Sequence, residues 1–185
     1  MKKITHCKNC GGDGHYAINC CSYWNTTLKT SKVIKNKTSK VLKKPSRSKA
    51  KKDAWTAFAT YIRKRDCLKT TGTFTYGKCV TCMQMGIDKV IDYARIQAGH
   101  AVGGRGNAVL FNEELVFGQC DYCNCKPPYG LGGNYSYYTL FLIDKYGREH
   151  AEELLKLKYQ TKVYKLHDFI EIKDEYEKKT LELLA

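Results

Sequence analysis

Two pairs of cysteines constrain the fold of this chain more than any other feature of its sequence. Cys79 and Cys82 form one Cys-x2-Cys pair, and Cys120 and Cys123 form a second pair about forty residues later. Four cysteines in this arrangement are the usual ligands of a structural zinc ion that clamps distant segments of a chain together. The interval is longer than in a simple zinc ribbon, so we expect the metal to bracket an inserted element.

The chain has ten cysteines, and we expect them to serve metal binding rather than disulfide formation. No run of the sequence approaches the ~18 apolar residues of a membrane span, and the first residues lack the apolar stretch of a signal peptide. The sequence therefore predicts a cytoplasmic protein without a membrane partner, in a compartment that keeps thiols reduced. Cys67 and Cys125, outside the two pairs, are expected to be free thiols.

The N-terminus contains a second predicted metal site. Cys7, Cys10, His15 and Cys20 follow the pattern C-x2-C-x4-H-x4-C, with glycines directly after the second cysteine and directly before the histidine. Three thiolates and one imidazole complete a tetrahedral zinc site, and the glycines let the backbone fold closely around the metal. So short a segment has no core of its own, so zinc binding must fold it. We interpret residues 1–24 as a CCHC zinc knuckle.

Positive charge is concentrated in the same region. Residues 1–52 hold 14 Lys and Arg against one acidic residue, whereas the remainder holds 18 basic and 17 acidic residues. Such an uneven distribution of charge is typical of a protein that binds a phosphate backbone. Residues 25–52, which are rich in Lys, Ser and Thr, could also be a solubilising flexible linker. The residues expected to contact nucleic acid are Tyr16, Trp24, Lys43, Lys44, Arg47, Lys51, Lys52 and Arg105.

Hydrophobic periodicity predicts an α+β core after the linker. Asp53 is a candidate N-cap for a helix to about Asp66, whose basic residues 63–65 are either solvated or in contact with phosphate. Residues 70–133 are typical of hairpins and loops, with short strands at 73–76, 90–93 and 109–111. Three helical segments follow, with apolar positions at Tyr135, Tyr138 and Leu142, at Ala151, Leu154 and Leu155, and at Leu166, Phe169, Ile172 and Tyr176.

A candidate catalytic site lies between and after the cysteine pairs. Gln97-Ala98-Gly99-His100 lies between them, and Asn124 directly follows the second pair. A histidine on a hairpin, a Cys-x2-Cys pair and a polar residue after it form the order of the HNH, or ββα-metal, nuclease motif. A neutral imidazole can deprotonate water while a divalent cation polarises a phosphate. By spacing alone, a purely structural role for His100 stays open.

Many short segments of the chain, taken together, resemble the phage NinG/Rap family. They occur in the family's order from about residue 53 to residue 155. They are Ala54-Trp55-x2-Phe58-x2-Tyr61-Ile62-x2-Arg65-Asp66, Thr70-Thr71-Gly72, Cys79-Val80-Thr81-Cys82, Gln97-Ala98-Gly99-His100, Gly104-Arg105-x-Asn107-Ala108-Val109-Leu110-Phe111, Gln119-Cys120-x2-Cys123-Asn124, Gly133-Asn134 and Tyr146-Gly147.

This resemblance implies an HNH-type recombination endonuclease that cleaves branched DNA such as D-loops and Holliday junctions. It implies that His100 is the catalytic histidine, that Asn124 is a metal ligand, and that Arg105 and Asn107 approach the phosphate. The sequence departs from the family pattern at Leu115, where an Asn is expected, at Gly106, and at residues 125–132, which lengthen a loop. A phage origin would place the protein in the host cytoplasm.

Together these features predict an α+β protein with four parts. They are a CCHC zinc knuckle at 1–24, a basic flexible linker at 25–52, an HNH nuclease domain with a four-cysteine zinc site at 53–160, and a C-terminal helix at 161–185. The predicted cofactors are two structural Zn²⁺ ions and a catalytic Mg²⁺ or Mn²⁺, and the predicted partner is branched, partly single-stranded DNA, with a homodimer possible. The alternatives are a non-catalytic, zinc-dependent protein that binds or anneals single strands, and an RNA-directed nuclease.

Overall fold

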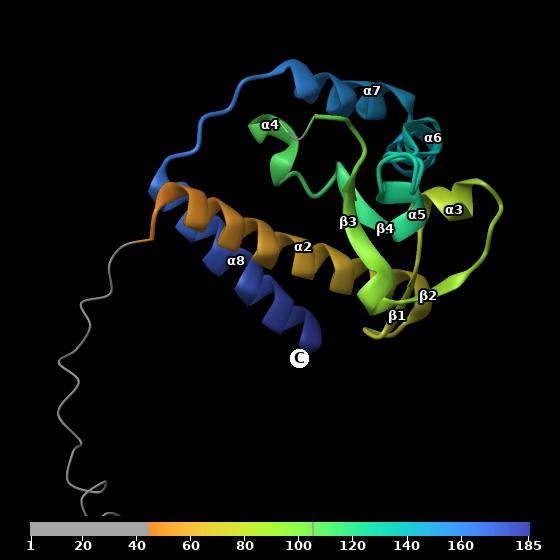
Figure 1. Ribbon diagram of the computed structural model, residues 1–185, viewed down its shortest axis with the longest axis horizontal. Helices are drawn as coiled ribbons and strands as arrows, with labels where there is room; N and C mark the ends of the chain where they lie inside the picture. The colour runs from red at the N-terminus through yellow and green to blue at the C-terminus, as the bar shows by residue number, and fades with distance from the viewer. Residues whose placement is uncertain (1–44, 105) are drawn as a thin grey trace, which may run out of the picture. The chain divides into compact units, whose positions relative to one another are not determined.

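The computed structural model describes residues 45–104 and 106–185, which form an α+β fold as predicted. Two antiparallel two-stranded sheets, β1–β2 and β3–β4, lie among the helices (Figure 1). None of the helices in these residues combines the length and hydrophobicity of a transmembrane span. The elements are α2 (Arg47–Thr71), β1 (Tyr76–Lys78), α3 (Val80–Gln84), β2 (Val90–Asp92), η2 (Tyr93–Arg95), β3 (Ile96–His100), α4 (Asn107–Leu110), β4 (Val116–Cys120), α5 (Asp121–Asn124), α6 (Tyr135–Tyr146), α7 (Arg148–Lys156), η3 (Leu157–Tyr159) and α8 (Leu166–Leu184).

Helix α2 starts earlier than the sequence suggested. The predicted N-cap at Asp53 is wrong, because Ser46 caps the helix by accepting the Lys49 N–H at 3.3 Å. Asp53 lies inside the helix, where it pairs with Lys49 at 2.6 Å. The predicted linker therefore extends too far, since residues 47–52 are helical. Lysine is a good helix former, and the buried Ala50 gives this basic stretch an apolar side.

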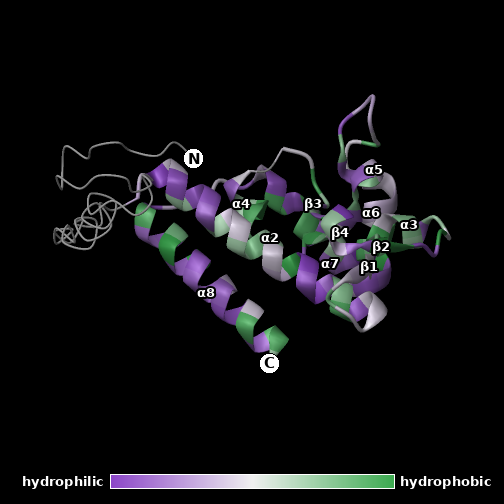
Figure 2. Cartoon of the chain, turned by 60° about the horizontal axis from the view of Figure 1, so that its bottom comes forward, coloured by the Kyte–Doolittle hydropathy of each residue, from purple (hydrophilic) through white to green (hydrophobic). Residues whose placement is uncertain are grey.

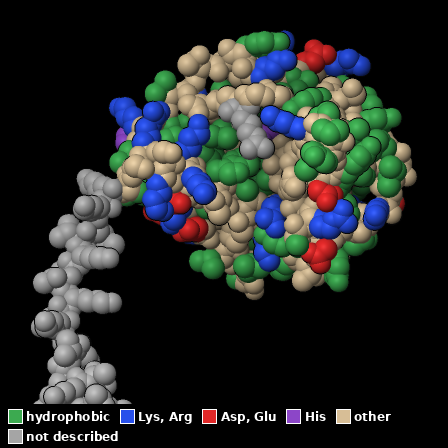
Figure 3. Space-filling view, in the orientation of Figure 1, with side chains coloured by type: hydrophobic (Ala, Val, Ile, Leu, Met, Phe, Trp, Pro, Cys, Tyr) green, Lys and Arg blue, Asp and Glu red, His purple; other side chains and the backbone are tan. Residues whose placement is uncertain are grey.

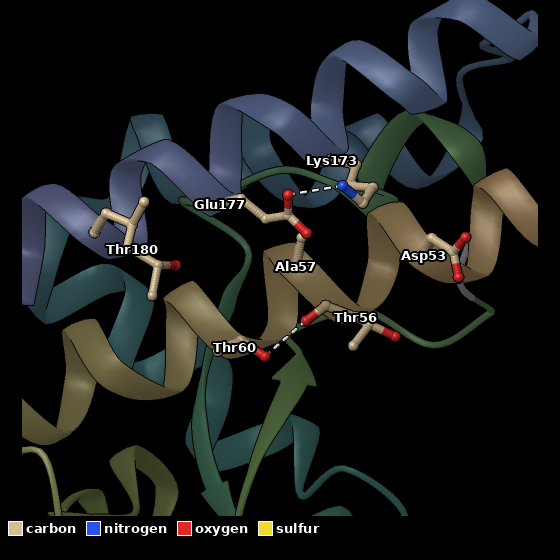
Figure 4. A pocket seen from close by; sticks show the side chains of 8 residues that line it. Asp53, Thr56, Ala57, Thr60, Lys173, Glu177 and Thr180 are labelled. Atoms are coloured by element: carbon tan, nitrogen blue, oxygen red, sulfur yellow. Dashed lines mark hydrogen bonds and ion pairs between the residues drawn. The ribbon is translucent and has the colours of Figure 1, made fainter. Parts of the chain in front are cut away.

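Helix α8 lies alongside α2, so the C-terminal helix is part of the same core (Figure 1). Phe58 of α2 meets Tyr176 of α8 edge to face, with ring centroids 4.8 Å apart. A groove of about 530 Å³ remains between the two helices, where Thr56 and Lys173 face it from opposite sides (Figure 4). No residue that we singled out as a catalytic, metal or nucleic-acid site lines this groove.

A buried ion pair joins α2 to strand β4. Arg65 Nε binds Asp66 Oδ1 at 2.7 Å, Arg65 also donates to the carbonyl of Val116 at 3.0 Å, and Asp66 Oδ2 accepts the Gly118 N–H at 2.7 Å. Arg65 is 6% exposed, so it is neither solvated nor available to phosphate. Removing one member of such a pair leaves a buried charge at a cost of about 3–5 kcal/mol. The pair thereby fixes the hairpin against α2.

The β3–β4 hairpin is the centre of the fold. Ile96 pairs with Cys120 and His100 pairs with Val116, and all five residues of β4 are buried. The strand predicted at 109–111 is wrong: the segment lies in and just after helix α4, which begins after Gly106. A short apolar run does not distinguish a strand from a buried helical turn. The strand predicted at 73–76 is likewise nearly absent, because β1 begins only at Tyr76.

Candidate metal centre and active site

The two cysteine pairs come together at the end of the β3–β4 hairpin. Cys79 and Cys82 lie at the start of α3, and Cys120 and Cys123 lie where β4 passes into α5. All four sulfur atoms are within 4.8 Å of one another, and Cys82 Sγ lies 3.8 Å from that of Cys120 and 3.6 Å from that of Cys123. Zinc–sulfur bonds of about 2.3 Å in a tetrahedron place the sulfurs about 3.8 Å apart. The four cysteines therefore fit a zinc ion.

Electrostatics support the same conclusion. The hydrogen bond with the Cys120 thiol lowers the pKa of Cys79 to about 4, whereas burial raises the pKa of Cys82 to about 12. The hydrogen bond to Cys79 raises the pKa of Cys120. Without a cation, deprotonation of Cys79 is therefore favoured, and deprotonation of Cys82 and Cys120 is disfavoured. A divalent cation is what would allow all four sulfurs to be deprotonated together.

The surrounding residues hold this cluster in place. The Cys123 N–H donates to Cys120 Sγ at 3.3 Å, and Asn134 Nδ2 lies 3.8 Å from Cys123 Sγ. Buried Gln119 donates to Thr81 Oγ1 of α3 and to the carbonyl of Gly133, so that one side chain links α3, β4 and the start of α6. Such outer contacts orient metal ligands and tune their basicity.

The sequence Gln97-Ala98-Gly99-His100 has a structural reason for its small residues. A Cβ at Gly99 would overlap Oε1 of Gln119, so only glycine leaves room for the buried amide of Gln119. The carbonyl of Gly99 accepts the buried Tyr138 hydroxyl at 2.8 Å. Strand β3 is therefore held on one face by α6 and on the other by α2, and His100 is its last residue.

His100 is buried, and its ring makes both a stacking contact and a hydrogen bond. Its ring stacks on Trp55 of α2, with centroids 5.1 Å apart and an angle of 18° between the planes. Its Nε2 lies 3.2 Å from the carbonyl of Leu110. Because a carbonyl only accepts, this bond places the proton of a neutral imidazole on Nε2 and the basic lone pair on Nδ1. Nδ1 is itself buried in this structure.

His100 and Asn124 line the same pocket, which has a volume of about 560 Å³. Asn124 ends α5, and its amide Nδ2 donates to Gln97 Oε1 at 2.6 Å. That bond leaves the carbonyl oxygen of Asn124 as a potential ligand for a hard cation. The other described residues that line this pocket are Val102, Gly104, Lys126, Gly132 and Tyr135, and none of them is acidic.

Asn107 does not line this pocket, and its side chain instead forms hydrogen bonds to other parts of the fold. Its Oδ1 accepts from Lys51 Nζ at 2.9 Å, and its Nδ2 donates to the carbonyl of Lys162 at 3.0 Å. Arg47 is engaged similarly, with the carbonyl of Tyr164 at 2.8 Å, whereas Lys52 is exposed on α2. Several predicted sites fall outside the described residues: Cys7, Cys10, His15, Tyr16, Cys20, Trp24, Lys43, Lys44 and Arg105.

The sequence interpretation missed several residues of the pocket. Gln97 was part of a recognised segment but received no role, because only the structure shows its bond to Asn124. Lys126 belongs to the loop of residues 125–132, whose backbone path follows from no periodic pattern in the sequence. Tyr135 was predicted on the apolar face of α6, yet it is 42% exposed and lines the pocket.

Comparison with known proteins adds one match. The family model described as the bacteriophage lambda NinG protein matches residues 24–184, which is most of the chain. No curated protein and no solved structure was found to match. The match spans the four cysteines, the β3–β4 hairpin and the pocket that contains His100.

Proposed function

Because the chain belongs to the bacteriophage lambda NinG family, we propose that it is a metal-dependent endonuclease that cleaves branched DNA intermediates of recombination, such as D-loops and Holliday junctions. The observation that carries this proposal is the pocket shared by His100 and Asn124, directly beside the four-cysteine cluster. The order of hairpin histidine, cysteine pair and metal-binding side chain is that of an HNH site.

The four cysteines would hold a structural zinc ion. Their sulfurs form a complete tetrahedral donor set, and a closed set of this kind leaves no position for a substrate. The site ties α3 to the junction of β4 and α5, and thereby fixes the strand next to β3. Its proposed role is to hold Asn124 at a constant distance from His100.

The pocket would supply the chemistry. His100 would accept a proton from the attacking water, while Trp55 and the Leu110 carbonyl keep the ring in place. Asn124 would bind the catalytic cation through its amide oxygen, with Gln97 fixing the amide. Bound Mg²⁺ or Mn²⁺ would polarise the scissile phosphate and stabilise the leaving oxygen. Lys126 would attract the phosphate to the pocket.

One observation favours the alternative of a non-catalytic protein that binds or anneals single strands. The described residues lining the pocket include no Asp or Glu, whereas Mg²⁺ is usually held by at least one carboxylate. With only an imidazole and an amide available, the cation would depend on water and on DNA phosphate oxygens for its other ligands.

Incubation of the zinc-loaded chain with labelled DNA distinguishes the two functions. We expect a four-way junction to be cut after addition of Mg²⁺ or Mn²⁺, and a linear duplex of the same sequences to be cut much less. Binding of the junction without cutting under either cation would favour the non-catalytic protein. Failure to bind the junction at all would exclude the junction nuclease.

A further inference from the structure

The loop after α5, residues 125–132, projects from the described part of the chain (Figure 2). The loop is nevertheless closely tied to α5. The Gly132 N–H donates to the carbonyl of Cys125 at 2.7 Å, and the Leu131 N–H donates to that of Tyr122 at 2.9 Å. A Cβ at Gly130 would overlap both of these carbonyls. The backbone therefore closes on itself and presents the loop tip in a fixed position.

The loop and its surroundings expose aromatic side chains. Tyr129 at the tip is 84% exposed, Tyr122 is 58% exposed, and Tyr135, at the start of α6, is 42% exposed. Figure 3 shows hydrophobic side chains gathered over the region that α5 and α6 occupy in Figure 1. Several rigidly presented rings at the surface are costly to hydrate, and they are suited to stacking against a flat partner.

This surface is continuous with the candidate active site. Lys126 and Gly132 of the loop line the pocket of His100, as does Tyr135. The Tyr135 ring lies against Gly133, where a Cβ would come within 2.6 Å of it, and its hydroxyl lies near Gly103, where a Cβ would be 3.4 Å away. The loop and Tyr135 therefore border the pocket that contains Asn124.

The charge of the loop favours a negatively charged partner. Residues 125–132 include Lys126 and no acidic residue, and the nearby Asp121 is paired with Arg95 at 2.9 Å. A lysine among exposed aromatic rings suits a polyanion with flat, unpaired bases better than a protein surface. Because stacking tolerates any base, this surface would select for unpaired structure rather than for sequence.

We propose that residues 125–132 form a stacking wedge, in which Tyr129 stacks on an unpaired base at the branch point of DNA and Lys126 contacts the adjoining phosphate. The inference rests on the proposed function, which it extends by naming the element that recognises the branch.

The test compares Tyr129→Ala and Tyr129→Trp with Tyr159→Ala as the control. Tyr159 is 79% exposed and does not line the pocket, so its removal deletes a ring of equal exposure elsewhere. The zinc-loaded full chain is titrated against a four-way junction that carries 2-aminopurine at the branch point, without Mg²⁺ or Mn²⁺. Anisotropy reports binding, and quenching of the 2-aminopurine reports stacking.

We expect Tyr129→Ala to bind the junction about 5- to 150-fold more weakly and to lose the quenching. Tyr129→Trp and Tyr159→Ala should resemble the parent. A Tyr129→Ala protein that binds and quenches like the parent would overturn the wedge while leaving the nuclease proposal intact. If the parent quenches through Tyr129 but never cleaves, the nuclease proposal fails and the wedge stands. A parent that does not bind junctions overturns both.

Discussion

The four-cysteine cluster and the His100 pocket lie side by side but are built on opposite principles. The cluster has a complete set of identical donors, three of them buried, with every sulfur within 4.8 Å of the others. The pocket has one imidazole and one amide around about 560 Å³ of open space. A metal that holds a fold needs a closed set of ligands, whereas a metal that takes part in a reaction needs open positions for water and substrate.

Loss of the cluster should therefore have the largest effect, because it acts on the fold. Structural zinc contributes an apparent ~10–16 kcal/mol, which matches or exceeds the ~5–15 kcal/mol net stability of a domain. We expect Cys82→Ser to lose the cluster's zinc and the cooperative unfolding transition of the α2–α8 region. Elemental analysis and thermal unfolding measure both. Cys125→Ser is the matched control, since that partly exposed cysteine lies outside the cluster. Equal transitions in the two variants would mean that the cluster does not hold the fold.

Asn124→Ala should weaken cleavage by about 10- to 100-fold, a loss typical of weakened metal coordination, and leave the fold unchanged. Excess Mn²⁺ should restore part of the activity. Asn124→Asp should instead strengthen binding of the cation, because a carboxylate is the ligand that the pocket lacks. Cleavage rates measured across a Mn²⁺ titration give the metal dependence of each variant. An Asn124→Ala protein with the metal dependence of the parent would remove Asn124 from the pocket's metal site.

Gln97→Ala should have a smaller effect, about tenfold, because it acts through the orientation of Asn124 rather than on the metal itself. Gln97→Glu keeps an oxygen that accepts from Asn124 Nδ2, so it should cleave more like the parent. The rates of the two variants at saturating and limiting Mn²⁺ measure this. An equal loss of cleavage in both variants would indicate that Gln97 does not act through its hydrogen bond to Asn124.

Removing residues 1–44 should leave the four-cysteine cluster and the His100 pocket intact and should weaken DNA binding, because the basic arm is lost. The cut preserves Ser46, the observed N-cap of α2. We expect zinc content to fall from two ions to one, and the dependence of binding on salt to become less steep. Each lost phosphate contact changes the log–log slope by about 0.9 on duplex DNA. Unchanged zinc content would count against the N-terminal knuckle, and an unchanged slope would make the arm a simple tether.

The cysteine pairs and C-terminal helices were readable from the sequence because their signals are local. Cys-x2-Cys fixes ligands by spacing, and the apolar residues of α6 to α8 recur with the helical period. The start of α2 was misread because a lysine-rich helix with a serine cap has the composition of a linker. Strands β3 and β4 were harder to place, since β4 is buried throughout and shows no alternation of polar and apolar residues.

The candidate site was predictable only in part. His100 and Asn124 follow from the motif order, and the structure places both at one pocket. The contacts that orient them, Trp55 on His100 and Gln97 on Asn124, join residues 45 and 27 positions apart and leave no sequence pattern. Asn107 was assigned to the phosphate by its position in a motif, yet its amide is bound to Lys51 and to the backbone of Lys162.

The most direct test of the account is one preparation of His100→Ala in which zinc content, junction binding and junction cleavage are all measured. His100 is not a ligand of the cluster and lies at the opposite end of the β3–β4 ladder from Cys120, so zinc and binding should match the parent. Cleavage should fall by about 10²–10⁴-fold, the usual contribution of a general base, and added Mn²⁺ should not restore it. His167→Ala, on the exposed side of α8, should cut like the parent. A His100→Ala protein that keeps its zinc, binds junctions and cuts them at the parent rate would contradict the account.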